Sequence, residues 1–290
     1  MSERLPVIAV VGRPNVGKST FFNRVVGSRV AIVDDQPGVT RDRNFSKADW
    51  AGHHFFIVDT GGIVEDSDET MDKAIRQQAM LAVAEADVIL FLVDTKEGVQ
   101  PLDQKLAEVL RKTQTPVLLV ANKADNLPYN QDHQEFWSLG IGEPIPVSAL
   151  SGKGSGDLLD LVLEAIPEGA AEVYEEDTIR VAVVGKPNVG KSSFVNRLIG
   201  EERVVVSEVA GTTRDPIDTP FKYHGKNMVF VDTAGLRRQS KVKDNVEYYS
   251  TIRTERVVYG SDVCVVLIDS SDEELHAQDI KIIRTAWEAG

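Results

Sequence analysis

The sequence is poor in cysteine and has no hydrophobic run long enough to cross a membrane. Its single cysteine, Cys264, lies in an apolar run, which indicates a core thiol in a reduced, intracellular protein rather than a disulfide framework. No secretory signal peptide opens the chain, and the apolar runs are too short for a transmembrane helix. These absences predict a cytoplasmic protein.

The chain also lacks an excess of positive charge. Its 32 Lys and Arg residues against 45 Asp and Glu residues give a net charge of −13. This balance argues against a broad basic surface for DNA or RNA, although not against a local basic patch. No basic amphipathic helix suggests a membrane role. A length of 290 residues and a hydrophobic fraction of 42% suffice for about two domains, each with its own core.

What the sequence does contain is a glycine-rich loop between an apolar run and a helical pattern. Residues 12–19 read G-x-x-x-x-G-K-S, the spacing of a phosphate-binding loop. Glycines permit backbone torsions that turn N–H groups inward around anionic oxygens, and the following helix N-terminus adds donors. The lysine can reach the outer phosphates, and the serine hydroxyl suits Mg²⁺. The residues expected around a nucleotide are Gly12, Arg13, Pro14, Asn15, Val16, Gly17, Lys18, Ser19 and Thr20.

The same loop occurs a second time, and residue 185 follows residue 12 by 173 positions. It again follows an apolar run and precedes a helical pattern. Two chance matches in register are not credible, so the chain contains an internal repeat. The second set of expected nucleotide-binding residues is Gly185, Lys186, Pro187, Asn188, Val189, Gly190, Lys191, Ser192 and Ser193.

Two further motifs follow each loop. A threonine in a polar loop can complete a Mg²⁺ shell when a γ-phosphate is present, although alone it is compatible with an ordinary turn. An aspartate after a buried strand can hold Mg²⁺ through water, and a nearby glycine N–H can face the γ-phosphate. The expected metal ligands are Ser19, Thr40, Asp59, Ser192, Thr213 and Asp232. The residues that complete the aspartate motifs are Thr60, Gly61, Gly62, Ile63, Thr233, Ala234, Gly235 and Leu236.

A base-reading motif is expected at residues 122–125, N-K-A-D. Asp125 can accept two hydrogen bonds from the N1–H and 2-amino groups of guanine, a donor pair that adenine lacks, so the motif predicts GTP rather than ATP. Alone, the motif is compatible with a surface turn. Asn122 is expected to brace the neighbouring loops, and the stem of Lys123 is expected to lie along the base. The backbone of a further loop would reach the guanine O6. The remaining residues expected at the base are Ala124 and the members of that loop, Ser148, Ala149 and Leu150.

The second copy has no such motif within the sequence. An equivalent of Asn122 would fall near residue 297, so we expect that copy to be incomplete at its C-terminus.

The alternation of apolar runs and helical patterns predicts two α/β domains. Each is expected to have a mainly parallel sheet with one antiparallel edge strand and helices on both faces. We expect the first domain at 1–167, an acidic linker at 168–178 and the second domain at 179–290. The expected strands are 5–11, 44–50, 54–59, 88–94, 117–120, 145–147, 221–223, 228–231 and 263–269. The expected helices are 18–26, 70–84, 101–112, 157–165 and 277–289, and 204–215 is expected as a loop.

Together these motifs resemble the TRAFAC-class GTPases of the Era/TrmE-like branch. G-[RK]-P-N-V-G-K-S in both copies, D-T-G-G followed by D-T-A-G, and the acidic joint are similar to the tandem GTPases of the EngA (Der) family, over the whole chain. The resemblance implies tandem P-loop NTPase (G) domains that bind GTP or GDP with Mg²⁺ and hydrolyse GTP. It also implies a monomer that associates with the large ribosomal subunit during assembly, with nucleotide state setting the domain arrangement. By this resemblance the association would run mainly through a third, KH-like domain at the C-terminus of family members, which we expect to be missing here.

The resemblance also bears on mechanism. Many GTPases place a water-orienting glutamine after the third motif, where this chain has the hydrophobic Ile63 and Leu236. In the related GTPases a K⁺ ion replaces an arginine finger, held partly by an asparagine that matches Asn15 and Asn188. Alternatively, both asparagines only cap the loop. The expected catalytic residues are Asn15, Lys18, Thr40, Gly62, Asn188, Lys191, Thr213 and Gly235. A nucleotide-sensing module with incidental hydrolysis, or a GTPase of another Era/TrmE-like pathway, remains an open alternative.

Overall fold

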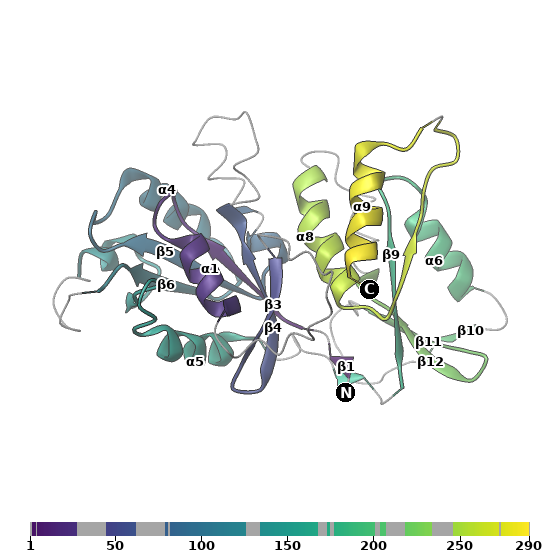
Figure 1. Cartoon of the computed structure of the whole chain (residues 1–290), viewed down its shortest axis with the longest axis horizontal. Coiled ribbons are helices and arrows are strands. Elements are labelled where there is room, and N and C mark those ends of the chain that lie inside the picture. Colours follow the sequence, from purple (N-terminus) through teal and green to yellow (C-terminus); the bar gives the residue numbers. More distant parts are fainter. Residues whose placement is uncertain are drawn as a thin grey trace. The chain divides into compact units, whose positions relative to one another are not determined.

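The computed structural model describes residues 2–3, 5–27, 45–61, 79–80, 82–125, 134–167, 173–174, 177–200, 204–206, 218–233, 246–272 and 274–289. The chain divides into two compact units. The first lies within residues 5–171, and the second lies within residues 172–290 and includes strand β1 (Ser2–Glu3). Figure 1 shows the helices and strands of both units.

The first unit is built on a six-stranded sheet in the order β3-β4-β2-β5-β6-β7. β3 and β4 form an antiparallel hairpin, and all other neighbours are parallel. The hairpin turns at Ala51 and Gly52, which have φ values of 51° and 82°. The strands expected at 44–50 and 54–59 thus form the expected antiparallel edge of the sheet. The strands are β2 (Val7–Val11), β3 (Phe45–Trp50), β4 (His53–Asp59), β5 (Val88–Asp94), β6 (Val117–Asn122) and β7 (Ile145–Pro146).

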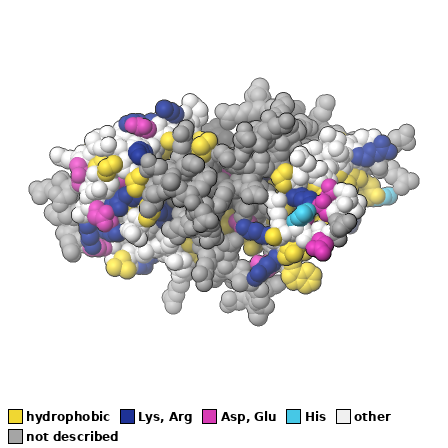
Figure 2. Space-filling view, turned by 90° about the horizontal axis from the view of Figure 1, so that it is seen from above, with side chains coloured by type: hydrophobic (Ala, Val, Ile, Leu, Met, Phe, Trp, Pro, Cys, Tyr) yellow, Lys and Arg dark blue, Asp and Glu magenta, His cyan; other side chains and the backbone are white. Residues whose placement is uncertain are grey.

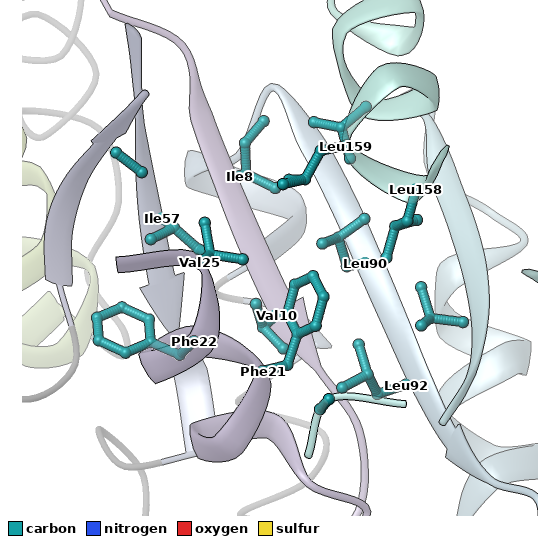
Figure 3. Close-up of a cluster of buried hydrophobic side chains, with 14 of the residues drawn as sticks. Ile8, Val10, Phe21, Phe22, Val25, Ile57, Leu90, Leu92, Leu158 and Leu159 are labelled. Carbon is teal, nitrogen blue, oxygen red and sulfur yellow. The ribbon is translucent and has the colours of Figure 1, made fainter. Parts of the chain in front are cut away.

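Helices cover both faces of this sheet. Helices α1 (Lys18–Gly27) and α5 (Ser155–Ala165) pack on one face, and α4 (Pro101–Leu110) with the 3-10 helix η1 (Gln134–Leu139) packs on the other. Successive side chains of β2 alternate between the two clusters, as strand geometry requires. Figure 3 shows the first cluster, in which Phe21 and Val25 of α1 and Leu158 of α5 gather over the central strands. β5 is buried along its whole length, as its uniformly apolar sequence predicts.

The second unit repeats this plan on a five-stranded sheet in the order β10-β11-β12-β9-β13. β9 is parallel to both neighbours, β11 is antiparallel to β12, and β10 adds a further antiparallel pairing at the edge. Helix α6 (Lys191–Ile199) packs on one face, while α8 (Val246–Tyr259) and α9 (Ala277–Glu288) lie side by side on the other (Figure 1). The strands are β9 (Ile179–Val184), β10 (Val204–Val206), β11 (Thr219–Tyr223), β12 (Lys226–Phe230) and β13 (Val263–Val266). The expected α/β class, with mixed sheets and helices on both faces, is confirmed. The first sheet is mainly parallel with one antiparallel edge strand, whereas two of the four described pairings of the second sheet are antiparallel.

Three elements differ from expectation. Residues 204–206 form strand β10 rather than a loop, because three consecutive β-branched valines favour an extended backbone. Helix α8 was not expected, because its Val, Thr and Tyr residues are weak helix formers. Packing of Val257 and Val258 against the sheet outweighs that preference. Within the stretch expected as a linker, β8 (Val173–Tyr174) pairs antiparallel with β1.

Some expectations of the sequence fall outside the described residues. The helix expected at 70–84 is described only at 79–80 and 82–84, which are helical. Across the residues that the structure describes, no helix is both long and apolar enough to span a membrane.

The single cysteine, Cys264, lies on β13 and is partly buried. Burial raises the pKa of its thiol to about 11, so the thiol is protonated at neutral pH.

Candidate nucleotide-binding site

The two glycine-rich loops adopt the same backbone conformation. Asn15 and Asn188 both have a φ of 65°, and Gly17 and Gly190 both have a φ of 98°. A positive φ is unusual for a residue with a side chain, although asparagine tolerates it better than most. The agreement of torsions between the two copies shows that the repeated sequence specifies one loop shape twice.

Close packing explains the first glycine of each loop. A Cβ atom on Gly12 would lie 2.5 Å from the carbonyl oxygen of Leu92 on β5, and one on Gly185 would likewise collide with the carbonyl oxygen of Leu267. The first loop therefore rests directly on the backbone of β5, and the second rests on the backbone of the residue that follows β13. Gly17 differs from its counterpart, because a Cβ there would collide with the Nδ2 atom of Asn122, whereas no atom of the described residues lies within 4 Å of a Cβ built on Gly190.

The lysine of each loop is buried and bonded to loop carbonyls. Lys18 and Lys191 are only 7% and 8% exposed. The Nζ atom of Lys18 donates to Arg13 O at 2.9 Å, and that of Lys191 donates to Gly185 O and Lys186 O, each at 2.8 Å. Burial lowers the pKa of Lys191 to about 8. An anionic ligand beside such a poorly solvated amine would favour its charged form, as expected for a phosphate site.

The first unit brings together two of its three predicted metal ligands. The Ser19 hydroxyl donates to Asp59 Oδ2 at 2.5 Å, and Asp59 is 1% exposed at the end of β4. The backbone N–H of Gly61 donates to the other carboxylate oxygen at 3.0 Å. A hydroxyl and a carboxylate at the mouth of a phosphate loop are a donor set that fits Mg²⁺, which prefers oxygen ligands and shares its shell with phosphates. Thr40, Gly62 and Ile63 lie outside the described residues.

The equivalent carboxylate of the second unit has a different partner. Both carboxylate oxygens of Asp232 accept hydrogen bonds from Arg253 of α8, Nη2 donating to Oδ1 at 2.7 Å and Nε donating to Oδ2. The N–H of Asp232 donates to Asp218 Oδ1 at 2.5 Å. The two carboxylates predicted to hold Mg²⁺ therefore differ in charge environment, one beside a hydroxyl and one in a bidentate ion pair. Thr213, Ala234, Gly235 and Leu236 lie outside the described residues.

The predicted base-reading loops lie beside the phosphate loop and are linked to it by Asn122. Its Nδ2 donates to Val16 O at 2.7 Å, and its Oδ1 accepts the Ala149 N–H at 2.9 Å. Asn122 thus braces both loops, as the sequence suggested. Lys123 does not extend freely, because its Nζ lies 2.7 Å from Asn15 O and 2.6 Å from Asp94 Oδ2.

Asp125 lies in the same cluster, at the position predicted to select the base. Its carboxylate accepts hydrogen bonds from the Ser148 hydroxyl and from Lys96 Nζ, the latter at 3.0 Å. These bonds, the one from Ser148 most strongly, hold the pKa of Asp125 below its usual value. The group is therefore ionised at neutral pH and can accept hydrogen bonds from a ligand.

Three contacting residues were not anticipated from the sequence. Arg24 of α1 donates from Nε to Ala149 O at 3.0 Å and from Nη2 to Leu150 O, so it supports the predicted O6-reading loop. Lys96 contacts Asp125, and Arg253 contacts Asp232. The repeated pair N-R after each loop, which gives Arg24 and Arg197, was an available signal for the first. Lys96 and Arg253 carry no comparable pattern.

Positive charge does not gather into one patch on the surface seen in Figure 2. Lys and Arg side chains of the described residues lie scattered among Asp and Glu side chains on that face.

The side chains of Asn15 and Asn188 are exposed at their loops, at positions where a bound ligand could reach them.

Comparison with known proteins adds a family context. A sequence model described as "50S ribosome-binding GTPase" matches residues 7–123 and 180–289. GTPase Der of Gemmatimonas aurantiaca is 59% identical over 286 residues, covering 99% of this chain and 65% of that relative. GTPase Der of Alkaliphilus metalliredigens is 50% identical over 285 residues, covering 98% and 64%. The chain thus spans just under two thirds of the length of these relatives, and the expected resemblance to the EngA (Der) tandem GTPases is confirmed.

The chain is also similar to a solved structure of Era in complex with MgGDPNP and nucleotides 1506–1542 of 16S ribosomal RNA. The sequence identity is 24%, the TM-score is 0.47, and the alignment covers 98% of this chain and 99% of that chain.

The contrast between Gly17 and Gly190 leads to a stability prediction. Gly17→Ala should lower the free energy of unfolding of the first unit by about 2–3 kcal/mol, since it adds a strained torsion and displaces Asn122 from its two hydrogen bonds. Gly190→Ala should cost the second unit only about 1 kcal/mol, the strain of a positive φ alone. Hydrogen exchange read separately in β6 and β9 would measure each unit.

Gly52→Ala is the matched control in the first unit, because Gly52 has a φ of 82° and a Cβ built on it would have no described atom within 4 Å. Equal losses for Gly17→Ala and Gly52→Ala would mean that the contact with Asn122 does not matter.

Proposed function

Because the chain belongs to the family of 50S ribosome-binding GTPases, we propose that it binds guanine nucleotides with Mg²⁺ and hydrolyses GTP to GDP and phosphate. The observation that carries this proposal is the repeated loop with a buried lysine held by loop carbonyls, beside the Ser19–Asp59 pair in the first unit. The proposed domains are residues 1–167 and 179–290, joined by 168–178. The short paired strands β1 and β8 depart from this division, because both belong to the second compact unit.

In the first unit the loop N–H groups and Lys18 bind the phosphates. Ser19 and Asp59 hold Mg²⁺, the ion that neutralises charge on the β- and γ-phosphates in this reaction class. Thr40 and Gly62 complete the γ-phosphate site. Asp125 selects guanine, and Asn122 keeps the base-reading and phosphate loops in register through its two hydrogen bonds. Positioning and electrostatics account for most of the rate, as is usual in phosphoryl transfer.

In the second unit Lys191 and Ser192 take the matching roles, with Thr213, Asp232 and Gly235 at the γ-phosphate side. The ion pair between Asp232 and Arg253 must open before that carboxylate can support Mg²⁺. This observation favours a second role for the unit, that of a nucleotide sensor with little hydrolysis of its own. The first unit, whose Asp59 has no such ion pair among the described residues, is then the main catalyst.

A further part of the proposal concerns K⁺. Hydrophobic Ile63 and Leu236 cannot orient the attacking water, so charge stabilisation must come from elsewhere. The exposed Asn15, in its left-handed conformation, stands at the phosphate loop where its side-chain oxygen can help to hold a monovalent cation. Asn188 stands at the same position of the second loop.

The proposed partner is the large ribosomal subunit or its precursor, in the cytoplasm, with nucleotide state controlling the association. The description of the matched family supports this partner. Since the net charge of the chain is −13, a contact with ribosomal RNA would use a local group of basic residues rather than a broad basic face.

Base selection tests the proposal most directly. In a Lys191→Ala background, which removes the second loop's lysine, the chain should bind GTP far more tightly than ATP. Asp125→Asn should weaken GTP binding by about 100-fold and shift preference toward xanthosine triphosphate, whose 2-oxo group accepts from an amide. Isothermal titration would measure both. Asp157→Asn, at an exposed position of α5, is the control; equal binding of GTP and ATP by the parent chain would refute guanine specificity.

The cation proposal gives a rate prediction. Phosphate release from GTP should be at least about tenfold faster in KCl than in NaCl at equal ionic strength, because a desolvated cation stabilises charge between the phosphates. Asn15→Ala should remove most of that difference, and Asn188→Ala reports the share of the second loop. Turnover that is indifferent to K⁺ would leave Asn15 with only a loop-shaping role.

Association with the ribosome can be measured by co-sedimentation with purified large subunits. We expect more of the chain in the subunit fraction with a non-hydrolysable GTP analogue than with GDP, and Lys18→Ala should abolish that difference. GTPase Der of Gemmatimonas aurantiaca serves as the comparison at full length. Absence of binding in every nucleotide state, while that relative binds, would reject the partner for this chain.

A further inference from the structure

The second residue of each phosphate loop points its cationic side chain at a pair of carboxylates. Arg13 Nη2 lies 2.8 Å from Glu97 Oε2, and Arg13 Nε lies 3.4 Å from Asp103 Oδ2. In the second unit, Lys186 Nζ contacts Asp272 Oδ2 and lies 3.4 Å from Asp279 Oδ2. Both residues were expected from the sequence among the phosphate-binding set. Their side chains instead engage acidic partners within the protein.

The two acids come from the same two places in each unit. Glu97 and Asp272 lie in the turn that follows β5 or β13, and Asp103 and Asp279 are each the third residue of the next helix, α4 or α9. The helical acid also accepts the N–H of the residue before its helix, Gln100 at 3.0 Å and His276 at 3.3 Å. It therefore caps the helix and binds the loop cation at the same time.

The two helix acids are buried, so their ionised carboxylates need a positively charged partner. The side chains of Asp103 and Asp279 are 0% and 2% exposed. Burial raises the pKa of Asp103, while the Gln100 N–H and the Arg13 guanidinium act in the opposite direction. Removing one partner of a buried pair leaves an uncompensated charge, which is strongly unfavourable. Each loop cation is thus held at a fixed point of the neighbouring helix.

The anchored residue also positions the lysine of the loop. The carbonyl oxygen of Arg13 accepts the hydrogen bond from Lys18 Nζ at 2.9 Å, and that of Lys186 accepts from Lys191 Nζ at 2.8 Å. A chain of contacts therefore links the helix acid to the loop lysine. In the first unit, Asp103 binds the Arg13 side chain, and the Arg13 carbonyl oxygen accepts the hydrogen bond from Lys18.

Independent variation between the copies indicates that this arrangement is maintained. The cation is arginine in one unit and lysine in the other, and the turn acid is glutamate in one and aspartate in the other. Asp103 follows Asp94 by nine residues, whereas Asp279 follows Asp269 by ten. The ion pairs persist although the residue types and the spacing have changed.

We propose that Arg13 and Lys186 are positioning residues that anchor the phosphate loops to the acid pairs Glu97/Asp103 and Asp272/Asp279, and do not themselves bind phosphate. The inference rests on the proposed function, because it assumes that the loops bind a nucleotide. It deepens that function by assigning four acids, none of which belongs to a recognised loop motif, to the nucleotide site.

The test measures a fluorescent GDP analogue by stopped flow, on the full chain in a Lys191→Ala background. Arg13→Gln and Asp103→Asn should each raise Kd by about tenfold, mainly through faster dissociation, since a loosened loop releases its ligand sooner. The double variant should be no weaker than either single variant. Arg13→Lys, which reproduces the second unit, should stay within about twofold of the parent, and Asp103→Asn should add no effect to Lys18→Ala.

Two further variants complete the test, one as a control and one as a substitute for Asp103→Asn. Glu108→Gln removes an exposed acid from the same helix and should leave binding unchanged. Glu97→Gln, at a half-exposed position, should raise Kd by about threefold and serves if Asp103→Asn does not fold, as judged by circular dichroism. Weaker binding in Arg13→Gln with parental binding in Asp103→Asn or Glu97→Gln would make Arg13 a phosphate ligand and overturn the anchor. A parent chain that binds no guanine nucleotide would overturn the proposed function itself.

Discussion

The architecture of this protein depends on how closely the phosphate loop rests on the adjacent strand. At Gly12 the loop backbone lies so near the carbonyl of Leu92 that no Cβ fits between them, and Gly185 stands in the same relation to Leu267. In the first unit this carbonyl belongs to β5, which is buried along its whole length, whereas in the second unit it belongs to the residue that follows the partly buried β13. The apolar clusters on both faces of each sheet hold these strands in place. The core thus fixes the strand, and the strand fixes the loop.

On this base, polar contacts set the loop in its final position. In the first unit the loop is held from three sides, by Asn122 at Val16 O, by Lys123 at Asn15 O and by the acids that bind Arg13. Such contacts reduce the freedom that the loop would lose on binding a ligand, and so favour binding through preorganisation. The same side chains link the phosphate site to the predicted base site. If the chain binds a nucleotide as proposed, these side chains connect the sites for its two ends.

Much of this could be predicted from the sequence, because glycine spacing and apolar runs report directly on local backbone geometry. The two loops, the hairpin at residues 51–52 and the buried strand β5 are of this kind. The strand β10 and the helix α8 were not predicted, since short valine runs and weak helix formers are decided by tertiary packing. The acid pairs and Arg253 were also not predicted. In these ion pairs, long side chains from separate elements meet, and no local sequence pattern indicates which acid a given cation will contact.

The internal repeat provides a comparison that separates loop shape from loop support. Asn15 and Asn188 share one φ value, as do Gly17 and Gly190, so the two loops offer a ligand the same backbone donors. The described surroundings of the two loops differ. Asp59 accepts a hydrogen bond from a hydroxyl, while Asp232 pairs with Arg253, and Asn122 packs on Gly17, while no described atom lies within 4 Å of a Cβ built on Gly190. Among the described residues, these supporting contacts are therefore one source of any difference in nucleotide affinity or turnover between the units. In both units, the acids that bind the second loop residue, Arg13 or Lys186, are part of this support.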